Sequence, residues 1–447
     1  MDQAVSREAN LIDRIAAQYA ARKERLPGAG IPWLAGWRER AMASFAAHGL
    51  PTPKEEVWKY TNLNPLAKLA LVPAEPTTNG LAARNLPWLL PDNAAAHRLV
   101  FVDGWLRPDL CSLGNLPGGA SITNLAGLLE HDPASLEGRL GVLGTLEEQP
   151  LLALNAALLS DGFVLQLGRD VVVDDPIELL FITTASAEPK LSSPRNLVLA
   201  EAGSRAILVE RHVGLGEEVA HLANGATEIV LKEGASLLHC RLVEPAARAF
   251  HLWSLKAELG PLANYESFVV ATHGKLMRNE VAVALAGRGA SCRLNGAYMG
   301  RSRQHIDNTT AVDHACPETT SRQLYKGVLD GYARGVFQGR VLVRPGAQKT
   351  DGQQTSRALL LSEAAEIDTK PELEIYADDV KCSHGAAAGE LDPDAMFYLR
   401  SRGIPESVAR RLLVEAFLLD VVDEIGSETI RPCFQRIAAD WIAESGD

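Results

Sequence analysis

The chain has 447 residues, a formal net charge of −12, and hydrophobic and charged fractions of 47% and 22%. These values are typical of a water-soluble globular protein with two or three domains, and the negative charge argues against nucleic acid or an anionic membrane as a main partner. No apolar run approaches the roughly 20 residues that cross a bilayer, and the polar N-terminus carries no secretory signal, so we expect a cytoplasmic protein.

The first part of the chain alternates between helix and loop. Apolar spacing predicts helices over residues 4–22 and 31–48, and a short strand over residues 99–104 ends in a turn. A further helix is predicted over residues 150–159. We therefore expect residues 1–160 to form an N-terminal helical and mixed domain.

Short β-rich runs follow one another from residue 161 to residue 390, which we expect to form the core of the protein. A glycine followed by a small residue recurs at the turns, and the first two intervals, Gly203 to Gly234 and Gly234 to Gly289, are 31 and 55 residues. The second interval is close to two steps of the first kind, as expected for a solenoid whose coils turn at glycine. An antiparallel β-sandwich also has many short strands between turns. The spacing alone leaves both folds open.

Helical patterns return after residue 390. Asp392 is a suitable N-cap, and Pro393 suits the first turn of a short helix. Two further helices are predicted over residues 405–425 and 427–442 from their apolar spacing. We expect residues 391–447 to form a C-terminal helical domain.

Cys382 and His384 form the most interesting pair of side chains in the sequence. They stand two residues apart after an alternating strand pattern, so an extended backbone directs both side chains to the same face. A thiol and an imidazole on one face could bind iron or handle a persulfide, or they could be two ordinary half-buried residues. The six cysteines are scattered without any C-x-x-C spacing, which argues against a disulfide framework and against a self-contained cluster site; they are Cys111, Cys240, Cys292, Cys316, Cys382 and Cys433.

Motifs for nucleotide and hydrolytic chemistry are absent from the sequence. It has no G-x-x-x-x-G-K-[ST] loop, no G-x-S-x-G elbow and no H-E-x-x-H helix. We therefore expect that this chain binds no nucleotide and is not an enzyme. His305, His314 and Cys316 form a loose cluster that could in principle hold a metal.

Several segments resemble the SufB/SufD family of the SUF iron–sulfur cluster assembly system, and in particular its SufD branch. Residues 370–392 and 396–404 resemble the C-terminal signature of that branch, which is long and chemically distinctive. Residues 353–362 resemble the segment that leads into this signature, and residues 56–61 resemble the family's Trp-Lys/Arg-Tyr-Thr element. These landmarks extend from about residue 54 to residue 425, most of the chain.

The resemblance implies a mainly β fold, a right-handed parallel β-helix with helical flanks, and this favours the solenoid over the sandwich. It further implies a non-enzymatic scaffold subunit of the SufBCD complex. Such a subunit pairs with SufB through the β-helix and binds the SufC ATPase through the C-terminal helices, and it can form a homodimer when made alone. Binding of flavin by the complex is left open.

The resemblance also assigns a role to His384, which matches a SufD histidine at the interface where a transient iron–sulfur cluster is thought to form. Cys382 would be a second ligand or would only line that site. The segment that contains His305 and Cys316 matches β-helix strands of the family, which argues against a metal there. Residues 360–367 lack the cysteine that the SufB pattern carries, so the SufD branch fits better than a SufB-like sulfur acceptor.

Three further residues carry no expected chemistry of their own. Arg357 fixes strand ends or the interface, or it is simply a solvated corner, and Trp58 and Tyr60 are expected to be core anchors. The alternative from another class is a β-helix enzyme acting on carbohydrate. Such an enzyme needs convergent acids or bases along a groove, and the sequence offers no persuasive set.

Overall fold

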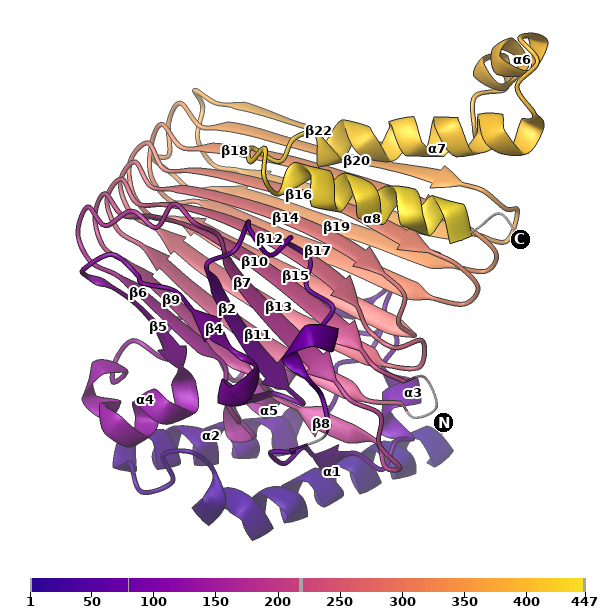
Figure 1. Cartoon of the computed structure of the whole chain (residues 1–447). Helices are drawn as coiled ribbons and strands as arrows, with labels where there is room; N and C mark the ends of the chain where they lie inside the picture. The colour runs from indigo at the N-terminus through magenta and orange to yellow at the C-terminus, as the bar shows by residue number, and fades with distance from the viewer. Residues whose placement is uncertain (1, 79, 217–219, 445–447) are drawn as a thin grey trace.

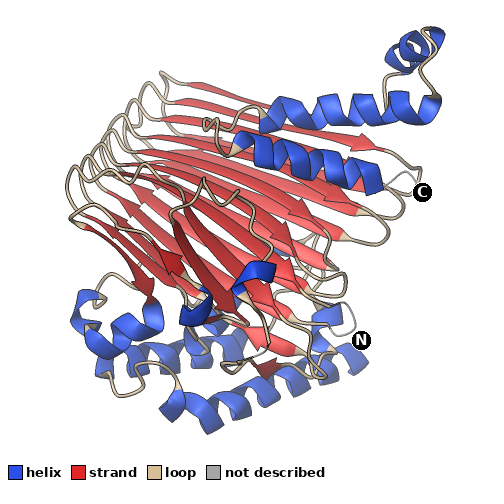
Figure 2. Ribbon diagram, in the orientation of Figure 1, coloured by secondary structure: helices blue, strands red, loops and turns tan. Residues whose placement is uncertain are grey.

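The computed structural model describes residues 2–78, 80–216 and 220–444 and consists of a parallel β-helix with helices at both flanks (Figure 1). Strands make up the body, and helices lie at the two flanks (Figure 2). The predicted parallel β-helix is confirmed, and the sandwich is excluded because the strands from β6 onward pair with one another in parallel.

The first flank contains five α-helices in its described residues, and its core combines their apolar faces with the outer face of one sheet. Leu34 and Phe45 of α2 pack with Leu154 of α5 and with Leu252 and Phe250 of the sheet. The helices of this flank are α1 (Asp2–Arg22), α2 (Pro32–His48), α3 (Asn64–Ala67), α4 (Leu125–His131) and α5 (Pro150–Ala157). The predicted helices over 4–22, 31–48 and 150–159 are therefore confirmed within a few residues.

From β9 onward, successive strands of the β-helix alternate between two sheets, so that each strand pairs with the strand two places later. The first sheet follows the order β21-β19-β17-β15-β13-β11-β9-β6-β5, with β1 and β8 attached at the side. Its strands are β1 (Val72–Pro73), β5 (Ala120–Asn124), β6 (Phe163–Leu167), β8 (Lys190–Ser192), β9 (Arg195–Ala200), β11 (Leu222–Leu231), β13 (Phe250–Leu259), β15 (Leu276–Leu285), β17 (His305–His314), β19 (Arg334–Val343) and β21 (Glu366–Ile375).

The second sheet follows the order β22-β20-β18-β16-β14-β12-β10-β7-β2-β3, with β4 beside β2. Its strands are β2 (His97–Val102), β3 (Trp105–Leu106), β4 (Ser112–Leu113), β7 (Ile177–Thr183), β10 (Arg205–Gly214), β12 (Ser236–Glu244), β14 (Asn264–Thr272), β16 (Ser291–Gly300), β18 (Thr320–Leu329), β20 (Asp351–Leu360) and β22 (Lys381–Gly389). Two strands of the predicted N-terminal domain pair with strands of the predicted core: β2 pairs with β7, and β5 pairs with β6. The division at residues 160 and 390 into three domains therefore stays a proposal.

Alternate residues of each strand face the interior and stack in register from coil to coil. On β13, Trp253, Leu255 and Ala257 belong to the interior cluster, whereas Phe250 and Leu252 face outward to the helices. Each large apolar side chain buried in this way stabilises the fold by about 1.5–3 kcal/mol. The interior is therefore a packed core rather than an open channel over most of its length.

The C-terminal helices lie along the outer face of the second sheet. Val414 and Leu418 of α7 (Glu406–Val422) and Phe434 of α8 (Arg431–Ala443) join one core with residues of that sheet. The short α6 (Pro393–Ser401) projects away from the body (Figure 1) and has no buried residue. None of the helices in the described parts of the chain is long and apolar enough to span a membrane. The expected cytoplasmic localisation stays a prediction.

Candidate functional site

The last coil of the β-helix, made by β21 and β22, leaves its interior face open. β22 pairs with β20 and is the terminal strand of its sheet, as β21 is of the other sheet. On β22 the inward positions continue the ladder from β20, with Cys382 in register with Gly352 and His384 in register with Gln354. Residues that every earlier coil would bury thus reach the surface here.

Cys382 and His384 share the inward face, as their spacing predicted, but their surroundings differ. His384 is exposed, and its side chain makes no hydrogen bond or ion pair with the described residues. Cys382 is half-buried and packs on an apolar cluster that contains Val341, Val343 and Ala377. Of the two, His384 is the side chain that is free to bind a ligand.

The thiol of Cys382 lies in a small polar niche that a glycine creates. A Cβ atom at Gly352 would lie 3.5 Å from the Cys382 Sγ, 3.5 Å from the Ser321 Oγ and 3.6 Å from the His314 Nε2. Burial raises the pKa of Cys382, and the backbone N–H of Gly352 offsets only part of this effect. In this chain by itself Cys382 is therefore a neutral thiol, which is a poor metal ligand until a partner changes its surroundings.

The loose cluster of His305, His314 and Cys316 does not converge. His314 is buried in the interior, and both of its ring nitrogens are hydrogen-bonded, to the hydroxyls of Thr319 at 2.8 Å and Ser321 at 2.9 Å. His305 faces outward and lies 2.9 Å from the Thr61 hydroxyl. Over the described residues, no group of three or more His, Cys, Asp or Glu side chains is arranged to hold a metal.

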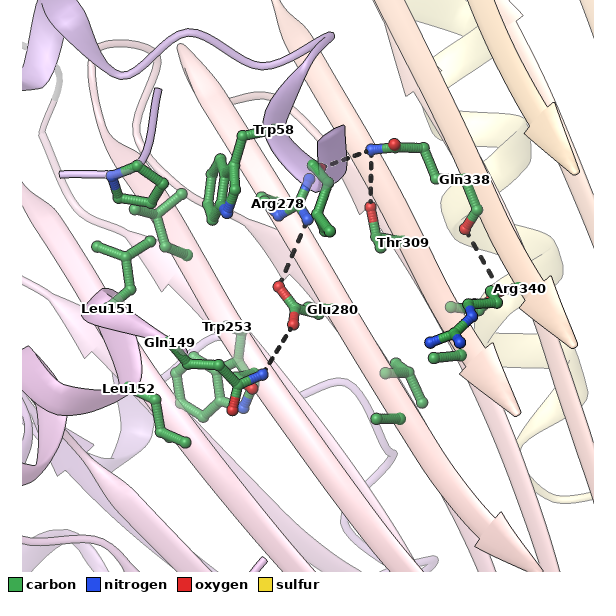
Figure 3. A pocket seen from close by; sticks show the side chains of 18 of the residues that line it. Trp58, Gln149, Leu151, Leu152, Trp253, Arg278, Glu280, Thr309, Gln338 and Arg340 are labelled. Carbon is green, nitrogen blue, oxygen red and sulfur yellow. Dashed lines mark hydrogen bonds and ion pairs between the residues drawn. The ribbon is translucent and has the colours of Figure 1, made fainter. Parts of the chain in front are cut away.

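A groove of about 480 Å³ on the outer face of the first sheet is the other notable cavity (Figure 3). One wall is the segment around Trp58, and the beginning of α5 forms the opposite wall. Figure 3 shows the Arg278 guanidinium beside the Trp58 ring, and their separation is 4.0 Å. Arg278 also pairs with Asp307, whose carboxylate accepts a hydrogen bond from Thr61.

Three carboxylates that line the groove are engaged in ion pairs: those of Glu56, Glu280 and Glu372. Glu280 pairs with Arg278 at 3.5 Å, and Glu372 pairs with Lys370 at 3.1 Å. Lys370 also binds Glu56 at 2.6 Å, which attaches the N-terminal segment to the last coil. The segment with the Trp-Lys-Tyr-Thr element therefore contacts several coils of the β-helix. The ion pairs in the groove give no support to a carbohydrate-active site.

A buried polar cluster in the early coils was not foreseen from the sequence. Glu210 accepts hydrogen bonds from His212 at 2.8 Å and from His239 at 2.9 Å, and all three side chains are buried. Burial lowers the pKa of both histidines, so both imidazoles are neutral. The spacing Glu-x-His on one strand hints at a shared face, but the partner on the next coil follows only from the register of the coils.

Two other predictions concern exposed positions. Arg357 is exposed on β20, which agrees with a solvated side chain. The carboxylate of Asp392 caps α6 through the backbone N–H groups of Asp394 and Ala395, as predicted. On α6 itself Phe397 and Tyr398 are 73% and 55% exposed, an unusual apolar surface for a short projecting helix.

Comparisons with known proteins agree with this architecture. Residues 181–417 match the family model described as the SUF system FeS cluster assembly SufBD core domain, and residues 90–179 match the SufBD protein N-terminal region. The chain is 32% identical over 397 residues to an iron–sulfur cluster assembly SufBD family protein of Synechocystis, covering 87% of this chain and 86% of the relative. It is 31% identical over 388 residues to the iron–sulfur cluster assembly protein SufD of Escherichia coli, covering 86% and 87%. A chloroplastic protein of Arabidopsis thaliana, ABCI7, is 30% identical over 417 residues, covering 91% and 85%.

Proposed function

Because the chain belongs to the SufBD family of SUF-system iron–sulfur cluster assembly proteins, we propose that it is a non-enzymatic scaffold subunit that completes a cluster site with a SufB-type partner. The observation that carries this proposal is the open last coil, where an interior position holds an exposed imidazole, that of His384.

The open coil is suited to pairing with another β-helix. Among the described strands, β21 and β22 each have one unpaired edge, and such edges favour the addition of further strands. Apolar side chains beside them are exposed, with Ile375 at 40% and Tyr376 at 61%. A partner that stacks on this coil would bury them together with His384. A second copy of this chain is the alternative occupant when SufB is absent.

His384 would bind iron at that interface, since a neutral imidazole is a competent iron ligand. One imidazole and one neutral thiol are too few donors for a cluster, so the partner supplies the remaining ligands. Cys382 lines the site in this account. The cluster is the cargo of the complex rather than a resident cofactor of this chain.

The C-terminal helices are proposed to bind a SufC-type ATPase. This chain has no phosphate loop, so ATP hydrolysis has to come from another subunit. The projecting α6, with Phe397 and Tyr398 exposed, offers apolar side chains for such a contact.

The experiment is co-expression with SufB and SufC, followed by iron and sulfide analysis of the purified complex. We expect His384→Ala to leave the complex assembled and to remove most of its cluster, because a methyl group cannot replace the ring nitrogen. His131→Ala, at an exposed histidine of α4, is the matched control and retains the cluster. A normal cluster content in the assembled His384→Ala complex would contradict the assignment.

A further inference from the structure

Three polar side chains form a ladder inside the last coils. Gln323 of β18, Gln354 of β20 and His384 of β22 occupy the same inward position in successive coils. Neighbouring strands lie about 4.8 Å apart, so each side chain stacks directly on the next. The ladder begins in the packed interior and ends at the exposed imidazole.

Gln354 stands out in this ladder because its amide is buried and unpaired. Its exposed fraction is 1%, and neither its Oε1 nor its Nε2 has a hydrogen-bond partner among the described residues. Burying an amide without partners destabilises a protein, and a leucine would fill the same space without that penalty. Stability alone therefore does not explain a glutamine at this position.

The Gln354 amide occupies space that a glycine on the facing strand leaves open. The amide lies over Gly339 of the facing strand, where a Cβ atom would come within 1.6 Å of the Gln354 Nε2. Gln323, one coil deeper, differs because its Oε1 accepts a hydrogen bond from the Thr310 hydroxyl at 2.7 Å. Of these two glutamines, the one in register with His384 has both polar atoms unpaired among the described residues.

We propose that Gln354 is a positioning residue for His384. The two side chains are not hydrogen-bonded in the structure, but they are in register on neighbouring strands, so a rotation of the exposed His384 ring brings one ring N–H to the Gln354 Oε1. That hydrogen bond fixes which ring nitrogen stays bare. The bare nitrogen then points out of the open coil, toward a metal held at the interface. Histidines that bind metals generally donate their other ring N–H to such an acceptor. The metal part of this inference rests on the proposed function, whereas the hydrogen bond does not.

The tautomer of His384 tests the hydrogen bond directly in the isolated protein. Side-chain ¹⁵N spectra of histidine-labelled protein at one fixed pH, with His384 assigned through His384→Ala, report which ring nitrogen carries the proton. We expect one dominant tautomer in the wild type and a mixture in Gln354→Leu. Gln354→Glu keeps an acceptor oxygen and should restore the single tautomer.

Two controls separate this role from a structural one. Gln323→Leu changes the same residue type one coil deeper and should leave the His384 spectrum unchanged. Gln354→Leu should keep or raise the melting temperature, because it removes an unpaired buried amide. An unchanged His384 tautomer in folded Gln354→Leu would overturn the proposal.

A second measurement concerns metal binding in the assembled complex. Gln354→Leu should lower the affinity of the His384 site for iron about 10- to 100-fold, the usual effect of losing the acceptor behind a metal-binding histidine. If the tautomer depends on Gln354 while His384→Ala leaves the cluster intact, the positioning role stands and the proposed function fails. If His384→Ala removes the cluster while the His384 tautomer is the same in the wild type and in Gln354→Leu, the proposed function stands and the positioning role fails.

Discussion

The two ends of the β-helix use the same inward positions in opposite ways. At the first end, Leu99, Phe101 and Leu165 face the interior, and each is no more than 2% exposed. At the last end, the inward Ile375 is 40% exposed and His384 lies at the surface. A repeating fold gives every coil an interior face, so a coil without a cover leaves core positions exposed. The proposed function depends on this missing cover.

The largest expected effect concerns a buried ion pair in the covered half. Glu228 pairs with Arg195 at 2.6 Å and accepts hydrogen bonds from the backbone N–H groups of Gly141 and Leu143. Glu228→Ala leaves a buried guanidinium without its anion and should cost about 3–5 kcal/mol in the free energy of unfolding. Urea denaturation measures this cost. A loss of less than about 1 kcal/mol in the free energy of unfolding would contradict the burial of the Arg195–Glu228 pair.

A matched pair of leucines compares the two ends directly. Leu165→Ala, in the first coils, should cost about 2–5 kcal/mol, because it opens a cavity in a sealed core. Leu373→Ala, on β21 of the open coil, should cost less than about 1.5 kcal/mol in the isolated chain, because Leu373 is only partly buried. Denaturation of both variants measures the two losses in the free energy of unfolding. Equal losses would show that the last coil is already covered in the isolated protein.

The pH dependence of stability follows from the buried histidines. Burial lowers the pKa of His314 to about 4, from the ordinary value of 6.5. The unfolded chain therefore takes up a proton as pH falls below about 6.5, whereas the folded protein does so only near pH 4. His314 alone should cost on the order of 3 kcal/mol of stability across that window, and the loss is absent above it. Unfolding free energies measured between pH 7 and pH 4 should show a shallower slope for His314→Gln; an identical slope would contradict the burial of a neutral imidazole.

The smallest effect on stability is expected on α6. Phe397 is 73% exposed, so Phe397→Ser should change the free energy of unfolding by no more than about 0.5 kcal/mol. The same variant should weaken binding to SufC strongly, because it removes an apolar side chain from the proposed contact. Calorimetric titration with SufC measures this loss, and Asp394→Ser on the same helix is the control. Full affinity in Phe397→Ser would exclude α6 as the docking element.

Local signals in the sequence predicted the corners of the coils, whereas the choice of the β-helix over the sandwich came from the family resemblance. The turn glycines Gly203, Gly234, Gly289 and Gly346 all adopt positive φ angles, between 65° and 87°, which is why glycine recurs at the corners of the coils. The spacing of Cys382 and His384 was also sufficient to place both on one face. Spacing could not show that one is half-buried and the other exposed, because that difference depends on the end of the coil stack.

Contacts between distant parts of the chain were beyond sequence reasoning. The Thr61 hydroxyl donates a hydrogen bond to Asp307, which is 246 residues away in the sequence. His239 is hydrogen-bonded to Glu210, which is 29 residues away. Both contacts depend on how many residues each coil contains and on where the N-terminal segment crosses the sheet. The unpaired amide of Gln354 likewise becomes visible only once its register with His384 is known.

The central claim is that the open last coil becomes an interior when a partner stacks on it. Hydrogen–deuterium exchange of this chain, alone and bound to SufB, tests this claim most directly. Slower amide exchange over residues 366–389 in the complex, with residues 163–200 unchanged, is the result that we predict. A complex that forms while exchange over residues 366–389 stays the same would place the partner elsewhere and contradict the account.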